Sequence, residues 1–389
     1  MIEQQCPVCG DIRLFPFLHR RQVPVHQNLV VMDKVIARSV TRGDLDLVVC
    51  EGCGFIFNKA FEFSLLSYGH DYDNTQSCSA YFDMYLDGLV TNLVEQHGVR
   101  NCTIVEVGCG KGQFIKKLVS YPGANNRGYG FDPSYVGPDT DLDGRVSFRR
   151  CYYDDRCVDV AADVVVCRHV IEHVPDPLVL LGSVRAALAG ASNTRVFFET
   201  PCVEWILRNR VVWDFFYEHC SLFTAESLGV AFERAGFVVE RVEHIFGGQY
   251  LWLEGRPSCT IPPLSPISPR TAELAKNYGV CEVGLKGEWL NRLQILCAEG
   301  KIALWGAGAK GATFANLIDP ACRLIDCIVD LNPNKQGKYI PGTGHPIVAP
   351  EDLSVRQVYS AVLMNPNYRD ENNRMLARAG IEVELIDWG

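Results

Sequence analysis

Four cysteines occur in two pairs whose spacing is typical of metal-binding turns. Cys6 and Cys9 stand in Cys-Pro-Val-Cys-Gly, and Cys50 and Cys53 stand in Cys-Glu-Gly-Cys-Gly. Two intervening residues let both thiolates of a pair face one ion, and four thiolates suit tetrahedral zinc. We expect one structural zinc ion, because a closed four-cysteine site leaves no open position for catalysis. The alternative, four unrelated reduced cysteines, does not explain the paired spacing.

A glycine-rich loop that follows an expected strand at 103–107 is the second candidate site. It contains Gly108, Gly110 and Gly112, and Glu106 precedes it. Glycines let the backbone approach a ligand at the carboxyl end of a strand. An NAD site would read G-x-G-x-x-G, whereas this loop reads G-x-G-x-G after an acidic residue. The carboxylate would repel a phosphate but could bind a cationic, methionine-like group directly or through water.

Polar residues after the later strands could complete a nucleoside site. Asp132 follows the next expected strand, where an acid suits both hydroxyls of a ribose. Tyr153 and Asp154 follow a third β-like run, where an adenine edge would lie, and His169 follows a further strand. Two side chains that precede the sheet could fold over the ligand as a lid, although helix packing explains them equally well. They are Tyr72 and Gln76.

The run Tyr217-Glu218-His219 offers a candidate general base. Histidine has a suitable pKa near neutral pH, and Glu218 could help to set the charge of the site. The structural alternative is that His219 only packs, ahead of a helix capped by Thr224. Beyond it, Gly247-Gly248 ends a strand at a sheet edge, which allows a ligand to approach closely. The candidate polar anchors beside this turn are Gln249 and Tyr250.

A second glycine loop, Gly306-x-Gly308-x-x-Gly311, has the spacing of a dinucleotide site. Lys310 lies inside this loop, and Asp330 follows the next strand, as in many related domains that bind no cofactor. The loop alone therefore does not establish NAD binding.

Alternating strands and helices should position these residues, which predicts an α/β chain with a doubly wound parallel sheet. The expected strands lie at 103–107, 128–131, 163–167, 195–198 and 301–305, and one expected helix lies at 113–120. Five prolines between 257 and 269 predict a connector, because proline continues neither a helix nor a central strand.

The first glycine loop, Asp132, Tyr153-Asp154 and His169 occur in the order found in class I S-adenosylmethionine (SAM) methyltransferases, which residues 100–245 resemble. A Rossmann-like domain that binds another nucleotide is the alternative. The stretch 305–343, together with Asn365-Pro-Asn-Tyr, resembles the C-terminal domain of sugar C-methyltransferases.

The whole chain then resembles the family of nucleotide-sugar C-3 C-methyltransferases. The implied order is a four-cysteine zinc domain at 1–60, a class I SAM domain at 61–256, a proline-rich linker and helix at 257–300, and a second Rossmann-like domain at 301–389. These enzymes methylate C-3 of a 4-keto-6-deoxy sugar carried on a nucleoside diphosphate. The resemblance therefore implies SAM and structural zinc as cofactors and a nucleotide-linked sugar as substrate.

The resemblance also assigns roles. His219 matches the family's base and Glu218 its acidic neighbour, while Tyr217 or Gln249 could stabilise the enolate. The family has a tyrosine where this chain has Phe216, and it has other residues around the Gly-Gly turn. Because of these departures, the resemblance predicts the chemistry more strongly than it predicts the substrate. The expected substrate contacts are Gln249, Tyr250, Lys310, Asn316 and Asn367.

Three other functions stay open at this point. The first is an O- or N-methyltransferase acting on another small acceptor. The second is a non-catalytic module that holds SAM or a nucleotide within an assembly. The third is a dehydrogenase that uses the loop at 306.

The composition excludes several classes of protein. The 389 residues carry 37 Lys and Arg against 46 Asp and Glu, and the net charge of −9 argues against nucleic-acid binding. No apolar run approaches the roughly 20 residues of a membrane span, and the N-terminus does not read as a signal peptide. The 17 cysteines, mostly single, fit a reducing cytoplasm better than a disulfide scaffold. The oligomeric state is not predicted.

Overall fold

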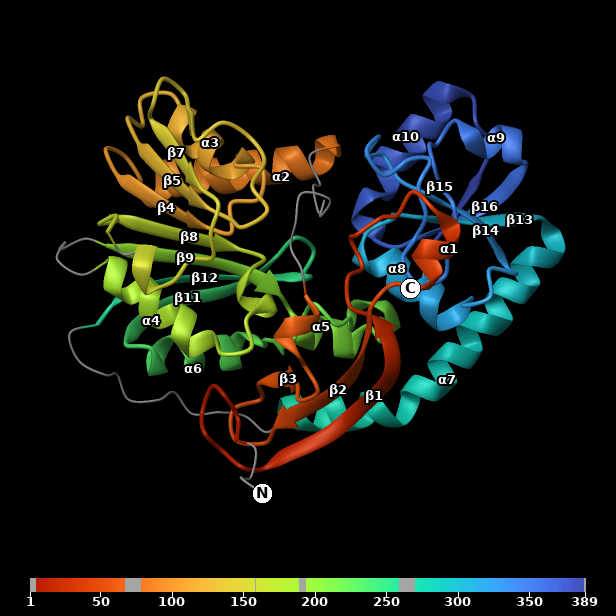
Figure 1. The fold of residues 1–389 in the computed structure, drawn as a ribbon, viewed down its shortest axis with the longest axis horizontal. Helices are drawn as coiled ribbons and strands as arrows, with labels where there is room; N and C mark the ends of the chain where they lie inside the picture. The colour runs from red at the N-terminus through yellow and green to blue at the C-terminus, as the bar shows by residue number, and fades with distance from the viewer. Residues whose placement is uncertain (1–4, 67–77, 158, 189–193, 259–269, 388–389) are drawn as a thin grey trace.

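The computed structural model describes residues 5–66, 78–157, 159–188, 194–258 and 270–387. Within these ranges the strands form three sheets, of four, eight and five strands. Figure 1 shows the eight-stranded sheet on the left, the five-stranded sheet on the right, and the N-terminal sheet below and between them. The predicted lid residues Tyr72 and Gln76 lie outside the described residues.

The N-terminal sheet takes one strand from far along the chain. Its first three strands, β1 (Leu14–Pro24), β2 (Arg42–Cys50) and β3 (Ile56–Asn58), are antiparallel neighbours. The fourth, β10 (Ser221–Leu222), directly follows the predicted base and pairs with β3. The 1–60 region therefore shares its sheet with the segment that contains His219, and its limits as a separate domain remain a proposal.

The eight-stranded sheet has the order β11-β12-β9-β8-β4-β5-β7-β6. The central five strands run parallel, and β12 joins antiparallel to β9. The chain winds outward from β4 through β5 to β7 and then returns to β8 beside β4, so the strand order reverses between β4 and β8, the place where ligands bind in sheets of this kind. The doubly wound sheet predicted from the sequence is confirmed. The strands are β4 (Thr103–Val107), β5 (Arg127–Phe131), β6 (Thr140–Asp141), β7 (Val146–Arg149), β8 (Val164–Arg168), β9 (Arg195–Pro201), β11 (Phe237–Ile245) and β12 (Tyr250–Pro257).

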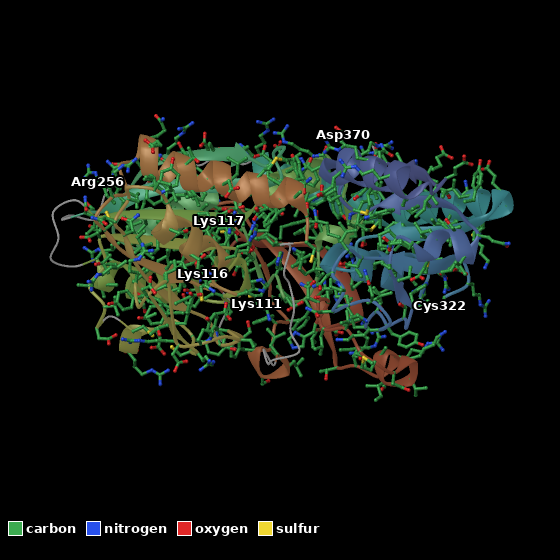
Figure 2. The ribbon with its side chains drawn as sticks, turned by 90° about the horizontal axis from the view of Figure 1, so that it is seen from above. Lys111, Lys116, Lys117, Arg256, Cys322 and Asp370 are labelled. Carbon is green, nitrogen blue, oxygen red and sulfur yellow. The ribbon has the colours of Figure 1, made fainter. Side chains whose placement is uncertain are left out.

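Helices cover both faces of this sheet (Figure 1). One face packs on α2 (Ala80–Thr91) and α3 (Gln113–Ser120), and the other on α4 (Pro177–Ala187) and α6 (Ala225–Arg234). Seen from above in Figure 2, Lys117 of α3 lies by α2, and its Nζ is 3.0 Å from Asp83 and 2.6 Å from Asp87. This ion-pair group fixes the helix that begins at the glycine loop.

The C-terminal sheet is parallel throughout, in the order β15-β14-β13-β16-β17. The 30-residue helix α7 (Arg270–Glu299) packs against both β1 and β13, so it connects the N-terminal sheet to this one (Figure 1). The second Rossmann-like unit predicted from 301 onward is confirmed. The remaining elements are α1 (Lys34–Arg38), α5 (Val203–Arg208), β13 (Lys301–Trp305), α8 (Ala309–Ile318), β14 (Ile325–Val329), β15 (Ile347–Val348), α9 (Asp352–Arg356), β16 (Val358–Leu363), α10 (Arg369–Ala379) and β17 (Glu384–Ile386).

A buried arginine joins three parts of the chain. Arg20 of β1 lies 2.8 Å from the Glu282 carboxylate of α7. Its other guanidinium nitrogens donate to the carbonyls of Val212 (2.7 Å) and Phe215 (2.9 Å). Because all of these groups are withdrawn from water, the pair fixes the position of the 212–215 segment relative to β1 and α7.

Arg20→Ala should lower the free energy of unfolding by about 3 kcal/mol, because breaking a buried pair leaves a charge and two carbonyls without partners. The expected loss is at the lower end of the usual range, since Lys286 also contacts Glu282. Denaturant titration of the whole chain measures it. The matched control Arg21→Ala, on an exposed residue of the same strand, should change it by less than about 0.5 kcal/mol. Equal losses in the two variants would contradict this assignment.

Candidate functional site

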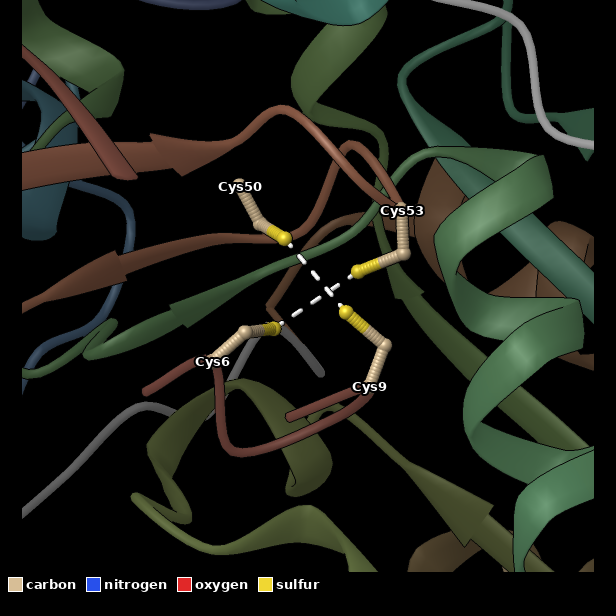
Figure 3. Close-up of side chains that lie close together, drawn as sticks. All are labelled: Cys6, Cys9, Cys50 and Cys53. Carbon is tan, nitrogen blue, oxygen red and sulfur yellow. Dashed lines mark hydrogen bonds between the residues drawn. The ribbon is translucent and has the colours of Figure 1, made fainter. Parts of the chain in front are cut away.

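The two cysteine pairs converge on one point, as Figure 3 shows. Cys6 Sγ lies 3.6 Å from Cys53 Sγ, and Cys9 Sγ lies 3.4 Å from Cys50 Sγ. All four sulfurs lie within 4.8 Å of one another. These separations are close to the roughly 3.8 Å edge of a tetrahedron with 2.3 Å zinc–sulfur bonds. The donor set therefore fits one structural zinc ion, and zinc itself remains a proposal.

The first glycine loop has the backbone that its glycines predict. Gly108, Gly110 and Gly112 all have positive φ, at +70°, +54° and +76°. A Cβ on Gly108 would lie 2.1 Å from Val170, and one on Gly112 would lie 2.5 Å from Phe148. A Cβ on Gly110 would meet no atom within 4 Å. The middle glycine therefore faces open space, while the outer two allow close packing.

Two carboxylates hold this loop. Asp132 accepts hydrogen bonds from Gly110 N (2.8 Å) and from the backbone and hydroxyl of Ser134. Glu106 is buried and accepts one from Ile115 N at 3.1 Å. Burial raises the pKa of Glu106 to about 8. Glu106 is therefore largely protonated near neutral pH and would ionise beside a cation.

The two other predicted nucleoside contacts differ in whether their polar groups already have partners. Tyr153 packs edge-on against Phe131, and its buried hydroxyl has no hydrogen-bond partner among the described residues. Asp154 is already engaged, because its carboxylate binds both the backbone and the guanidinium of Arg156. Tyr153 is thus the stronger candidate for a ligand contact.

His169, at the end of β8, lies between two carboxylates. Its Nε2 is 3.1 Å from Glu199 Oε1, and its Nδ1 is 3.3 Å from Glu172 Oε1. Glu199 also accepts hydrogen bonds from Arg168 Nε (2.6 Å) and Tyr85 OH (2.7 Å). Burial opposes the charge of His169, but the two carboxylates outweigh it and raise the pKa to about 9. His169 is therefore a fixed cation at neutral pH.

The predicted base lies in a compact polar group formed by Glu172, His173 and His219. One carboxylate oxygen and one nitrogen of each ring lie within 4.8 Å of one another. The two imidazole rings meet edge to face at 4.8 Å, and Phe216 packs on His219 at 4.0 Å. Burial, then the neighbouring His173, lowers the pKa of His219 well below its usual value. His219 is therefore neutral near pH 7, so a ring nitrogen can accept a proton, and the lowered pKa makes it a weaker base than a free imidazole.

The two residues before the base point away from it. Glu218 is fully buried, accepts a hydrogen bond from Gln27 N (2.9 Å) and lies 3.3 Å from His26 Nδ1. The hydroxyl of Tyr217 accepts a hydrogen bond from Glu62 N at 2.8 Å. The hydroxyl is engaged with the N-terminal region, which favours a positioning role for Tyr217 over the expected stabilisation of an enolate. Both side chains instead position the loop that carries His219.

A third group of polar side chains joins the eight-stranded sheet to the C-terminal unit. Lys310 Nζ lies 2.8 Å from Asp214 and 3.2 Å from Gln249 Oε1. Gln249 in turn exchanges hydrogen bonds with Asn365, at 2.9 and 3.2 Å. Lys310 has three donor positions and these contacts use two. Tyr250 lies beside this group and meets His169 edge-on at 4.5 Å.

Two of the predicted substrate contacts have other partners. Asn316 donates to the carbonyls of Ala312 and Pro341, and Asn367 donates to Phe246 O. Both therefore fix backbone. The sequence reasoning missed Glu172 and Asp214, although Glu172 directly precedes His173 at the end of a strand, a signal that could have been used.

The second glycine loop is closed by its own side chains. Asp330 accepts a hydrogen bond from Ala307 N at 2.8 Å, and the buried Lys335 donates to Ala307 O at 3.3 Å. A Cβ on Gly311 would lie 2.0 Å from Gly306 O, so this glycine serves packing between helix and loop. Asp330 therefore holds its loop in the same way that Asp132 holds the first glycine loop.

Comparison with known proteins agrees with this architecture. A methyltransferase domain model matches residues 82–242, and a C-methyltransferase C-terminal domain model matches residues 276–382. The C-methyltransferase NovU of Streptomyces niveus is 26% identical over 389 aligned positions, which cover 94% of this chain and 90% of that protein. The chain is a SAM-dependent methyltransferase.

Solved methyltransferase structures are similar to part of this chain at low identity. The 1,6-didemethyltoxoflavin-N1-methyltransferase of Burkholderia thailandensis is 15% identical, with a TM-score of 0.36, and the match covers 47% of this chain and 82% of that one. The N,N-8-amino-8-demethyl-D-riboflavin dimethyltransferase of Streptomyces davawensis is 20% identical, with a TM-score of 0.35, over 46% and 55%. Among the described helices of the methyltransferase, none is long and apolar enough to cross a membrane.

Freshly purified methyltransferase should contain about one zinc ion per chain, bound by the four converging cysteines. Cys50→Ser should lower both the zinc content and the thermal midpoint, because binding of a structural zinc contributes directly to folding. Elemental analysis and thermal unfolding measure the two effects. The control Cys281→Ser, on α7, should keep its zinc. Wild-type protein without zinc would refute the site.

SAM binding near pH 7 should release up to about one proton per chain, because the protonated Glu106 ionises when a cationic ammonium group binds beside it. Calorimetry in two buffers with different ionisation enthalpies measures the number of protons. Glu106→Gln should bind SAM more weakly and release none. A wild-type protein that binds SAM without releasing a proton would contradict the role of Glu106.

Proposed function

We propose that this methyltransferase adds a methyl group to C-3 of a 4-keto-6-deoxy sugar carried on a nucleoside diphosphate. The observation that carries the proposal is the part-buried His219, which stands beside Glu172 and His173, with Lys310 near enough to oppose a positive charge on it. A neutral imidazole in a site with fixed cations nearby suits removal of a proton α to a ketone. The matched C-methyltransferase C-terminal domain supports carbon as the acceptor.

In the proposed reaction, His219 takes the proton from C-3, and the electrons of the broken C–H bond pass into an enolate that includes the C-4 oxygen. SAM, when bound, supplies the electrophilic methyl group that the nucleophilic carbon takes up, while the sulfur leaves with the bonding electrons. The residues that would hold SAM are those of the first glycine loop, Gly108, Gly110 and Gly112, together with Glu106 and Asp132. Positioning of the two reactants provides much of the rate.

Lys310 supplies the positive charge that an enolate or a phosphate oxygen requires. Two of its donor positions are occupied by Asp214 and Gln249, so a third can reach a substrate oxygen. Its ammonium group also lies over the ring of Trp205 at 5.6 Å, which restricts its direction. Gln249 contacts Lys310 directly, and Asn365 of the C-terminal unit holds Gln249 in place. We assign Lys310, rather than Tyr217, to the stabilisation of substrate charge.

The nucleotide carried by the sugar can be identified by mass action. Ligands that bind the folded state raise its thermal midpoint, so a panel of TDP, GDP, UDP and CDP with S-adenosylhomocysteine should single out one nucleotide. That nucleotide defines the sugar donors to be tested for turnover.

His219→Asn should lower turnover about 10²- to 10⁴-fold, the usual contribution of a general base, while SAM affinity is unchanged. The wild-type enzyme should also exchange the C-3 hydrogen of the keto-sugar nucleotide with solvent deuterium, and the variant should not. Mass spectrometry of recovered substrate measures the exchange. His244→Asn, on an exposed residue of the edge strand β11, is the matched control and should stay active. A fully active His219→Asn enzyme would overturn the assignment of the base.

A further inference from the structure

We propose that Glu172 is the positioning carboxylate of His219, which it orients as a base and stabilises once the imidazole has taken up the substrate proton. This inference rests on the proposed function, because it assumes that His219 is the base. It adds Glu172 to the site. It assigns to Glu172 the acidic role that the resemblance gave to Glu218, the residue adjacent to His219 in the sequence.

The carboxylate of Glu172 is held at one oxygen and available at the other. Oε2 accepts a hydrogen bond from Thr200 Oγ1 at 3.0 Å. Oε1 is buried and has no hydrogen bond among the described residues, although His169 Nδ1 lies 3.3 Å away as an ion-pair contact. The residue itself is 1% exposed. A buried carboxylate oxygen without a donor is costly unless the working enzyme provides one.

His219 presents the complementary group. Its Nδ1 is also buried and without a hydrogen-bond partner among the described residues. One nitrogen of this ring and one oxygen of Glu172 lie within 4.8 Å of each other, so the two side chains are near neighbours. When His219 takes up a proton, both of its ring nitrogens become donors, and the one that faces Glu172 can donate to it.

The surrounding charges make a nearby anion necessary. His169 and Lys310 both oppose a positive charge on His219, as does His173. Glu199 offsets His169 on its far side, where it also binds Arg168 and Tyr85. Among the described residues, Glu172 is thus the carboxylate within 4.8 Å of the base, and its Oε1 lies 3.3 Å from His169 Nδ1. The proton balance is simple: C-3 loses the proton, His219 gains it, and Glu172 balances the new charge.

The test compares Glu172→Gln with wild type in turnover, C-3 exchange and their pH dependence. Gln retains an acceptor for Thr200 but has no charge, so kcat should fall about 10- to 100-fold with KM and SAM affinity unchanged. The acid limb of the exchange profile should move to lower pH, because loss of the anion makes the imidazolium less stable. In Glu172→Asp, the acid limb should lie between its positions in Glu172→Gln and in the wild-type enzyme. Glu204→Gln, which removes a surface partner of Arg208, should leave all of these values unchanged.

Two outcomes would overturn the proposal. One is a Glu172→Gln enzyme with wild-type kcat and an unmoved acid limb. The other is a second metal ion per chain that is lost in this variant, since Glu172 would then be a ligand. Failure of the proposed function would look different: the wild-type enzyme itself would show no C-3 exchange. SAM affinity, measured for every variant, reports that each one is folded.

Discussion

The buried carboxylate of Glu218 is the contact on which the candidate active site most depends. It accepts a hydrogen bond from Gln27 N and lies against His26, so the backbone of the N-terminal region fixes the residue directly before the base. Pairing of Ser221 with β3 fixes the residues just after it. His219 therefore lies between a residue held by the segment after β1 and a strand that belongs to the N-terminal sheet. The N-terminal region thus serves as a scaffold for the predicted base.

The polar interior balances its charges locally. Glu199 pairs with both Arg168 and His169, Glu172 contacts His169 through one oxygen, and burial raises the pKa of Glu106 to about 8. This arrangement of charges favours two events: the binding of a cationic methyl donor and the protonation of His219. Fixed charges of this kind stabilise a reaction without reorganisation, because they are set by folding.

Local patterns were sufficient to predict the regular elements around the cofactor loop. The strand at 103–107 and the helix at 113–120 have the predicted bounds, because hydrophobic periodicity and glycine spacing act over a few residues. The directions of side chains in the 212–222 segment were not predictable in this way. Glu218 and Tyr217 turn toward partners more than 150 residues away, and only the folded N-terminal region provides those partners. Sequence neighbours of a base need not be its neighbours in space.

The position of the transferred methyl group tests the central claim most directly. The enzyme would be incubated with SAM labelled with ¹³C in its methyl group and with a ¹³C-enriched 4-keto-6-deoxy sugar nucleotide, and the product examined by NMR. Carbon methylation predicts a methyl signal coupled through one bond to a sugar carbon. A methyl signal with the chemical shift of a methoxy or N-methyl group, without carbon–carbon coupling, would contradict the account.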